Sequence, residues 1–464
     1  MENRAEKYYW WILAAITLLG AALRFWHLGE LQQLIFDEVY FPKYAWDHLT
    51  GTYYFDTHPP LAKYLIAAGI WIHQHLPWVD APPIGSVAIE KMNAVAWRWL
   101  NAFSGTLLIV LAARTTFALR ASSTLSLLVA IFVATDGALV VESRFGLVNI
   151  YLAGFGLLGL YFLVQAFQRP RDAQRQLFFC GLGMGLSYSI KWNGLGFSLL
   201  PWVLVFSPSA ALWLLDKFRF SAKIMAGRPF HALFRSVPLW QQMLTLFVIP
   251  LVLYCLLWIP YVNQYERFGF VEMQKQIFGY HHNTIKADAH PYCSRWYTWP
   301  LMKRPISYYF HKAEPQDSPG GKNYYDIHLF GNPVLYWLAS ASLPLLLCLL
   351  LRSLWRWWRD KIIPEGLLFQ SVIIVGFAGN WLPWLLVSRC TFLYHYLPSS
   401  LFSFISLAWL LQRGLLSGKR WLQVLAGFAL LVILLSFLYF LPFQLGIPLN
   451  QESFYQRMWF RSWI

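Results

Sequence analysis

Charged residues are scarce in this chain. Asp, Glu, Lys and Arg make up only 13% of its 464 residues, whereas soluble domains carry about 25%. Hydrophobic residues account for 58% of the sequence, and the mean hydropathy is +0.44. This balance excludes an ordinary soluble domain and indicates a polytopic membrane protein.

Motifs of several common function classes are also missing. The sequence contains no Walker motif, no dinucleotide-binding fingerprint, no internal repeat and no low-complexity tract. Its five cysteines lack the spacing of a metal site, and His281-His282 has no companion ligands, so we expect no metal centre. Cys293 and Cys390 both fall in segments that we expect on one side of the membrane, where a disulfide between them is possible.

The positive charge does not indicate a nucleic-acid partner. The formal net charge is +15, but the basic residues fall largely in short loops between apolar runs. There they set the orientation in the membrane and contact anionic lipid. We therefore expect membrane lipids, and no nucleic acid, among the partners.

Apolar segments predict an all-α membrane fold. At about 20 residues per span, we expect roughly eleven transmembrane helices, at 8–27, 97–117, 124–142, 148–167, 177–190, 194–214, 241–260, 331–351, 366–387, 394–412 and 421–441. Residues 61–76 are apolar but short for a span and contain Lys63 and His73. An interfacial helix on the outer leaflet fits them better.

The short loops set the expected topology. Clusters of Lys and Arg occur in four of them, near residues 169–175, 217–235, 352–361 and 413–420, and an inside N-terminus places all four in the cytoplasm. Three long segments then lie outside, at about 28–96, 261–330 and after 441. We expect an N-terminal membrane module over 1–260 that carries the first outer loop, a second outer loop over 261–330, and a C-terminal module with an outer tail over 331–464.

The first outer loop begins with two adjacent carboxylates, Asp37 and Glu38. Carboxylates at a membrane surface are costly and therefore suggest binding or proton transfer. They repel each other, so we expect one of the two pKa values to rise, as suits a general base that takes a proton from a hydroxyl. A solvated acidic pair is an equally simple interpretation of these two residues alone.

Further polar residues fall at the expected outer ends of other helices. We expect an outward-facing cavity whose cations hold a phosphate and whose aromatic rings stack on a sugar. The members are His58, Lys63, Arg144, Lys191, Arg295, Trp299, Arg389 and His395. Singly, the cations could be snorkelling, the histidines structural and the tryptophans part of an interfacial belt.

These residues lie in blocks that resemble a known family. FDEVYFPKYAWDHLTGTYYFDTHPPLAKYLIA resembles the opening outer loop of the dolichyl-phosphate-mannose–protein mannosyltransferases, which are GT-C glycosyltransferases. The similarity continues, in the family order and over nearly the whole chain, through Arg98-Trp99-Leu100-Asn101, ESRFGLVNIYL, SYSIKWNGL, HPYCSRWYTWPLMKRPISYYF and WLPWLLVSRCTFLYHYLPS. It implies a GT-C architecture with outer-face loops and interfacial helices.

The resemblance also implies a reaction. A sugar, mannose in the family, moves with inversion from a polyprenyl phosphate to a Ser or Thr hydroxyl of a protein on the outer face. Asp37 matches the catalytic base, Glu38 would orient the base or the acceptor, and Arg98 matches a functional arginine. To these we add Lys191, Arg295, Arg389 and His395 as ligands of the donor phosphate or sugar, together with Arg98. We expect acceptor or loop support from His58, Lys63, Arg144 and Trp299.

The chain departs from the family pattern in two places. The second outer loop is too short for the β-trefoil module of many eukaryotic members, which suggests a short bacterial member in the plasma membrane. Asn149 stands where the family often has an acidic residue, although Asp136 and Glu142 are near in sequence.

Two other functions remain open at this stage. The acceptor could be a lipid or polysaccharide, because a fold does not fix the acceptor. An ion-coupled transporter would use the acidic pair as a proton site, but the chain lacks the internal repeats of many carriers. The identity of the sugar, a divalent cation at the phosphate and the oligomeric state are likewise undecided.

Overall fold

The protein is a bundle of helices with one small hairpin. The computed structural model describes residues 2–210, 236–265, 267–284, 289–314, 321, 323–360 and 363–464. Its helices are α1 (Glu2–Lys7), α2 (Tyr9–Phe25), α3 (Phe41–Thr50), α4 (Leu61–Gln74), α5 (Val95–Arg120), α6 (Ser123–Thr135), α7 (Gly137–Arg144), α8 (Asn149–Gln168), α9 (Ala173–Ile190), α10 (Leu195–Pro201), α13 (Leu239–Met243), α14 (Ile249–Gln264), α15 (Phe270–Gly279), α16 (Pro333–Asp360), α17 (Leu367–Trp381), α18 (Leu397–Leu415), α19 (Arg420–Leu445) and α20 (Gln451–Arg457). Strands β1 (Ile306–Lys312) and β2 (Tyr324–Leu329) form the hairpin.

The expected spans all fall on helices, apart from residues 211–214, which lie outside the described residues. Six helices of the described part are long and apolar enough to cross a membrane, and the bent pair α6–α7 would make a seventh. The other expected spans are shorter, broken or more polar, so fewer helices than the expected eleven meet this criterion. These helices confirm the prediction that the chain is a multi-pass membrane protein.

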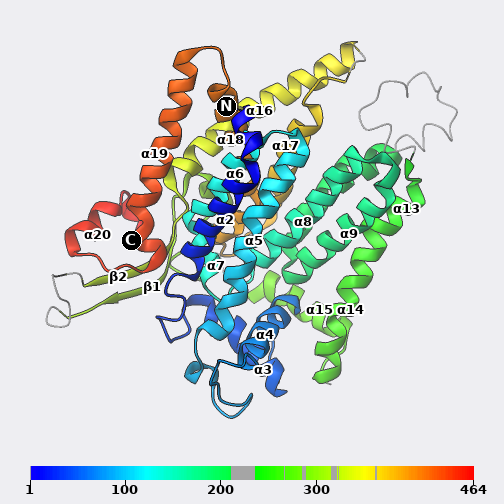
Figure 1. The fold of residues 1–464 in the computed structure, drawn as a ribbon. Coiled ribbons are helices and arrows are strands. Elements are labelled where there is room, and N and C mark those ends of the chain that lie inside the picture. The colour runs from blue at the N-terminus through cyan, green and yellow to red at the C-terminus, as the bar shows by residue number, and fades with distance from the viewer. Residues whose placement is uncertain are drawn as a thin grey trace.

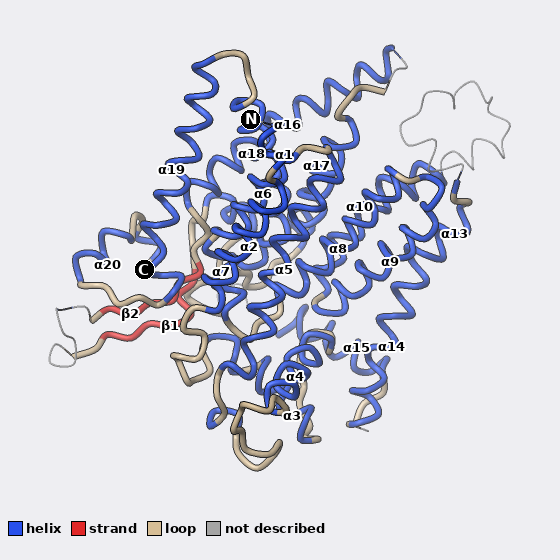
Figure 2. The backbone as a smooth tube through the Cα atoms, in the orientation of Figure 1, coloured by secondary structure: helices blue, strands red, loops and turns tan. Residues whose placement is uncertain are grey.

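The long helices run side by side through the bundle (Figures 1 and 2). Helices α3 and α4 lie below α5 in this view, and the N-terminus lies at the opposite end of the bundle. Helix α15 lies beside α14, where Tyr254 donates a hydrogen bond to Gln274 at 2.6 Å. Small residues let the helices approach closely. A Cβ on Gly183 of α9 would lie 2.6 Å from the backbone nitrogen of Gly159 in α8, so glycine at this position lets α8 and α9 pack closely.

The expected span 124–142 is broken. Helices α6 and α7 meet at an angle of 56° because Asp136 caps α7, accepting a hydrogen bond from the Leu139 amide at 3.1 Å. The other carboxylate oxygen accepts from the Asn332 amide at 3.0 Å. The bend directs α7 toward the lower end of the bundle, where it carries Glu142 and Arg144.

The segment expected as the second outer loop, 261–330, contains a β-hairpin that the sequence analysis did not predict. Strands β1 and β2 pair antiparallel, with Ile306 opposite Leu329 and an irregularity between Ser307 and Tyr309. Tyr324 also forms a bridge with Leu449 beyond α19. The hairpin projects from the side of the bundle next to α20 (Figure 2), and its base forms part of the site described next.

Candidate active site

Glu38 is a buried anchor for the loop after α2. Its side chain is fully buried, and its carboxylate accepts hydrogen bonds from Arg98 Nε at 2.9 Å and Nη2 at 2.7 Å. Trp97 Nε1 and the Gly146 and Ile35 amides donate to it as well, at 3.1, 2.8 and 3.2 Å. Five donors from three separate stretches of chain therefore fix the position of the residue next to Asp37.

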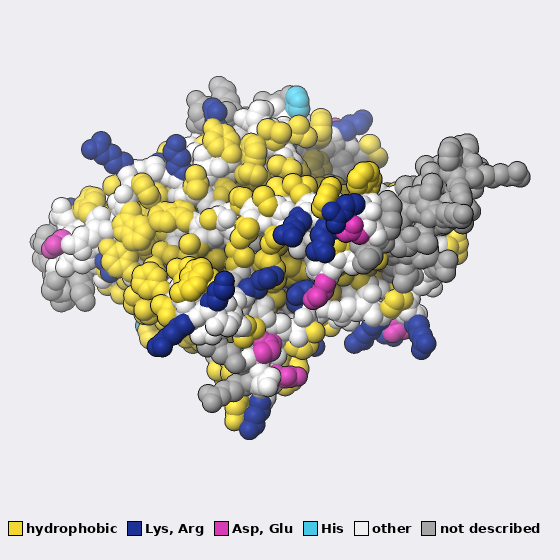
Figure 3. Space-filling view, turned by 90° about the horizontal axis from the view of Figure 1, so that it is seen from above, with side chains coloured by type: hydrophobic (Ala, Val, Ile, Leu, Met, Phe, Trp, Pro, Cys, Tyr) yellow, Lys and Arg dark blue, Asp and Glu magenta, His cyan; other side chains and the backbone are white. Residues whose placement is uncertain are grey.

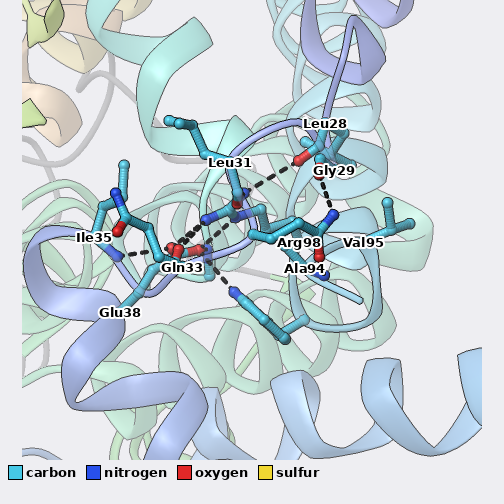
Figure 4. Close-up of polar contacts among 12 residues, drawn as sticks. Leu28, Gly29, Leu31, Gln33, Ile35, Glu38, Ala94, Val95 and Arg98 are labelled. Atoms are coloured by element: carbon cyan, nitrogen blue, oxygen red, sulfur yellow. Dashed lines mark hydrogen bonds and ion pairs between the residues drawn. The ribbon is translucent and has the colours of Figure 1, made fainter. Parts of the chain in front are cut away.

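Arg98 completes this anchor (Figure 4). Besides Glu38, it donates Nη1 to the carbonyls of Leu28 and Leu31, at 3.2 and 2.7 Å, and Nη2 to that of Gln33 at 2.9 Å. All five N–H groups of a guanidinium are thus engaged, and the residue is only 1% exposed. This corrects the expectation that Arg98 binds the donor phosphate, because the side chain fastens the loop to α5 instead.

Asp37 faces a different environment. It lies one residue earlier in the 3₁₀ turn Phe36–Val39 and is only half-buried. Burial raises the pKa of Asp37 to about 6, opposed by the charge of Lys191 and reinforced by that of Asp56. Asp37 is therefore a stronger base than an ordinary aspartate.

Lys191 lies between α9 and the turn Trp192–Gly194. Burial lowers the pKa of Lys191 to about 8, an effect opposed by Asp37 and reinforced by Arg389. The Lys191 ammonium lies over the Tyr394 ring, 5.0 Å from its centroid. Lys191 thus interacts electrostatically with both Asp37 and Arg389.

A third carboxylate, Glu142, belongs to the same group; the sequence analysis noted it near Asn149 but gave it no role in the site. It interacts electrostatically with Asp37 and Lys191. Glu142 accepts a hydrogen bond from the Tyr308 hydroxyl at 2.6 Å and two from the Asn149 amide, at 3.1 and 3.2 Å. Asn149, noted as a departure from the family pattern, is thus a partner of Glu142.

The hairpin supports the turn Phe36–Val39 through Tyr308. The Phe36 ring stacks on Tyr308 with centroids 4.1 Å apart. Phe36 has a φ of 48°, a left-handed conformation that is strained for a bulky side chain. Sequence reasoning missed Tyr308 because it saw no strand here, although residues 306–310 have the β-branched and aromatic composition that favours one.

Lys63 holds the turn that presents His58. Its ammonium contacts Asp56 Oδ2 at 2.5 Å and donates to the carbonyls of His58 and Pro59, at 2.9 and 2.6 Å. The His58 ring stacks on His281, with centroids 5.5 Å apart. Burial lowers the pKa of His58 well below its ordinary value, with Lys191 and His281 contributing, so His58 is neutral at pH 7.

The segment after α17, residues 382–396, also contributes side chains near Lys191. Arg389 influences Lys191 and His281 electrostatically, and its neighbour Cys390 forms a disulfide with Cys293. His395 is buried between Trp384 and Trp299, with ring centroids 4.3 and 5.9 Å away. The disulfide therefore joins the second outer loop to a cation of the site.

Two expected site residues lie apart from this group. Arg295 is exposed, and its Nη1 lies 3.5 Å from the Tyr297 hydroxyl, a position that does not support a role at the donor. Arg144 is buried and donates Nη1 to the carbonyls of Leu23 and Trp26, at 2.9 and 2.6 Å. It holds the end of α2, as a loop-support residue would.

Family models cover nearly the whole chain. Residues 14–265 match the model described as dolichyl-phosphate-mannose-protein mannosyltransferase, and residues 267–463 match the C-terminal four TMM region of protein-O-mannosyltransferase. The chain belongs to the dolichyl-phosphate-mannose–protein mannosyltransferase family. The predicted family and glycosyltransferase class are therefore confirmed.

Relatives of this mannosyltransferase span its full length. The polyprenol-phosphate-mannose–protein mannosyltransferases of Mycolicibacterium smegmatis and Corynebacterium glutamicum are each 24% identical to it, over 98% and 99% of this chain and 93% and 94% of theirs. The Pmt1–Pmt2 complex of Saccharomyces cerevisiae, bound to the sugar donor, has a TM-score of 0.79 at 15% identity, over 98% of this chain and 92% of that one. ArnT from Cupriavidus metallidurans in the apo state has a TM-score of 0.52 at 15% identity, over 92% and 63%. These likenesses confirm the GT-C fold.

The mannosyltransferase site contains few candidate metal ligands. Among the residues that the structure describes, no group of three or more His, Cys, Asp or Glu side chains could hold a metal ion. Positive charge at the site comes from Lys191 and Arg389, and the acidic groups Asp37, Glu142 and Asp56 surround Lys191. The described site therefore combines a half-buried carboxylate with two cations.

Proposed function

We propose that this mannosyltransferase moves a mannosyl group from a polyprenyl phosphate to a Ser or Thr hydroxyl of a protein, with inversion. The observation that carries the proposal is the electrostatic interaction of half-buried Asp37, a carboxylate of raised pKa, with the buried Lys191 ammonium. The names of the curated relatives support the donor and the acceptor class.

The reaction has one step. The acceptor oxygen attacks C1 of the mannose while Asp37 takes the hydroxyl proton. The bond between C1 and the phosphate oxygen breaks, and its electron pair leaves with the polyprenyl phosphate. Attack opposite to the leaving group inverts the configuration at C1.

The cations act on the leaving group. Charge develops on the phosphate as the bond breaks, and preorganised cations in a site of low polarity stabilise such charge. Lys191 and Arg389 are placed for this role, whereas Glu38 and Arg98 hold Asp37 in register. Neutral His58 and His395 can exchange hydrogen bonds with sugar hydroxyls without adding charge.

The site lies on the outer face in this proposal. The end of the bundle that carries the N-terminus shows many Lys and Arg side chains and fewer acids (Figure 3), as a cytoplasmic face would. The catalytic turn, α3 and α4 lie at the other end. The two family models meet between residues 265 and 267, which supports a membrane module over 1–260 and a second outer loop that starts near 261. A bacterial plasma membrane fits the bacterial relatives that span the whole chain.

The decisive experiment uses purified protein, a defined polyprenyl-phosphate mannose and a Ser/Thr peptide. Asp37→Asn is expected to lower kcat about 100- to 10,000-fold, the usual contribution of a general base. Asp80→Asn is the matched control, since Asp80 is an exposed aspartate of the same loop, and it is expected to retain the wild-type rate.

Three outcomes would redirect the proposal. Near wild-type transfer by Asp37→Asn would refute the catalytic base. Consumption of the donor without mannosylation of any peptide would favour a lipid or polysaccharide acceptor. A rate that falls on chelation with EDTA and returns with Mg²⁺ would add a divalent cation at the phosphate.

A further inference from the structure

A second cavity lies behind the Arg98 anchor. It has a volume of about 310 Å³ and is lined by the loop after α2, the end of α19 and one face of the hairpin. Neither Asp37 nor Lys191 lines it. Its size is in the range of small-molecule sites, and the reaction proposed above does not use it.

Arg144 gives this cavity a polar donor that its protein partners do not satisfy. Arg144 lines the cavity and is only 4% exposed. Its Nη1 holds the end of α2, but its buried Nε has no hydrogen-bond partner. Arg98, the other guanidinium in the lining, has all five N–H groups engaged. An acceptor oxygen inside the cavity would thus meet Arg144.

Two acidic residues line the same cavity, and one of them, Glu30, lies toward solvent. The Glu30 side chain is 68% exposed and lies 3.2 Å from His27 Nδ1. Asp326 is buried and accepts from Ser307 Oγ at 2.7 Å and His328 Nδ1 at 3.0 Å. The lining therefore places a cation on its inner wall and an available carboxylate toward its opening, which suits a ligand carrying both signs of charge.

The surroundings of the cavity are those of a membrane interface. It lies at the end of two apolar helices, α2 and α19, whose outward side chains include Phe25 at 41%, Trp26 at 52% and Leu438 at 51% exposure. Exposed Trp at a helix end is typical of the headgroup level. Leu28 and Leu445 add apolar surface to the lining.

We propose that this cavity binds the headgroup of an outer-leaflet phospholipid that carries a phosphate and a primary ammonium, such as phosphatidylethanolamine. The phosphate accepts a charge-assisted hydrogen bond from Arg144, and the ammonium donates to Glu30. Because Leu28 and Leu31 line the cavity and their carbonyls hold Arg98, the bound headgroup stabilises the loop that carries Asp37.

The test measures lipid retention, which is independent of the transfer reaction. Full-length protein is delipidated and re-equilibrated with phosphatidylethanolamine, phosphatidylglycerol or phosphatidylcholine, and the retained lipid is counted by native mass spectrometry. Phosphatidylethanolamine is expected to be retained about tenfold more strongly than the other two, the effect of one hydrogen bond to a charged group.

Variants separate the two contacts. Glu30→Gln, at an exposed position, is expected to remove the preference for phosphatidylethanolamine over phosphatidylglycerol. Arg144→Met is expected to lose retention of both lipids, whereas Arg461→Met, at an exposed arginine of the outer tail, retains them. Arg144→Met also removes the contacts that hold α2, so Glu30→Gln is the decisive variant.

Two results would overturn the proposal. Equal retention of the three lipids by wild type and Glu30→Gln would mean that water alone fills the cavity. Displacement of the lipid by inorganic phosphate as effectively as by glycerophosphoethanolamine would assign the site to free phosphate.

Discussion

Asp37 and Glu38 are sequence neighbours in opposite surroundings. Successive side chains of a 3₁₀ turn point about 120° apart, so one carboxylate enters the buried anchor while the other faces Lys191. Glu38 is saturated with donors, whereas Asp37 has a raised pKa. The geometry of the turn therefore gives the two carboxylates different roles: Glu38 anchors the loop, and Asp37 is left as the proposed base.

The two pKa values predict a bell-shaped pH profile of kcat/KM, which reports groups of the free enzyme. Asp37 must be ionised to accept a proton, so the rate rises as pH increases through about 6. Lys191 must be protonated to hold the phosphate, so the rate falls as pH increases through about 8. Transfer assays from pH 5 to 10 check this.

A variant tests the assignment of the alkaline limb. In Lys191→Arg the guanidinium stays protonated over this range, so the fall near pH 8 is expected to disappear while the acid limb remains. An unchanged alkaline limb in this variant would place that titration on another group.

The family resemblance pointed to Asp37, and charge and location pointed to Lys191 and Arg389; their roles stay predictions. The contacts of Arg98 were not predictable in the same way. Three of its partners are backbone carbonyls, of Leu28, Leu31 and Gln33, and carbonyls leave no signature in a sequence. Arg295 and Arg389 are each close in sequence to a cysteine of the disulfide. Only the folded structure shows that Arg295 is exposed whereas Arg389 is half-buried.

At the scale of elements, the loop after α2 is fastened to α5 by one buried ion pair. Arg98→Met would leave Glu38 buried and unpaired, which costs about 3–5 kcal/mol. We therefore expect a lower melting temperature and faster proteolysis of residues 28–38 in purified protein, together with a lower kcat.

The matched comparison for the ion pair is Glu38→Gln, alone and combined with Arg98→Met. The double variant is expected to be less destabilised than the sum of the single ones, because the two side chains act as a pair. If Arg98→Lys instead raises the KM for the donor and leaves the melting temperature unchanged, Arg98 serves the phosphate after all.

Helix positions were largely predictable from apolar runs, but two local features were not predicted. Thr135-Asp136-Gly137 contains an N-cap signal within an apolar run, and the run suggested a single straight span. The strand signals of residues 306–312 and 324–329 lie in a segment treated as a loop. Both features place Glu142 and Tyr308, which explains why the sequence analysis gave Glu142 no role and did not single out Tyr308.

At the scale of the whole molecule, the disulfide joins parts of the chain that are 97 residues apart. A cross-link that closes a loop of about 100 residues stabilises by about 4 to 5 kcal/mol in the chain-entropy account. Cys293→Ser, or a reductant added to wild type, is expected to lower the melting temperature and weaken donor binding through Arg389.

Cys255→Ser is the control for this experiment, because Cys255 is not cross-linked, and it is expected to behave as wild type. A melting temperature that is insensitive both to reductant and to Cys293→Ser would show that the cross-link does not stabilise the outer assembly.

The expected topology can be tested on the intact protein. A fusion of alkaline phosphatase, which is active only outside the cytoplasm, is expected to be active after Ile464 and inactive before Met1. Fusions at residues 171 and 417, in two of the basic loops, are expected to be inactive. Activity at either loop fusion would contradict the orientation.

The stacking of Phe36 on Tyr308 also limits how this enzyme can be recombined with its relatives. The left-handed Phe36 adjoins Asp37, and the ring that supports it comes from a strand some 270 residues later in the chain. A chimera that takes residues 28–63 from one parent and the hairpin from another would retain the proposed catalytic residues yet lose the fit between Phe36 and Tyr308. Active chimeras are therefore expected only when residues 28–63 and 306–329 are exchanged together.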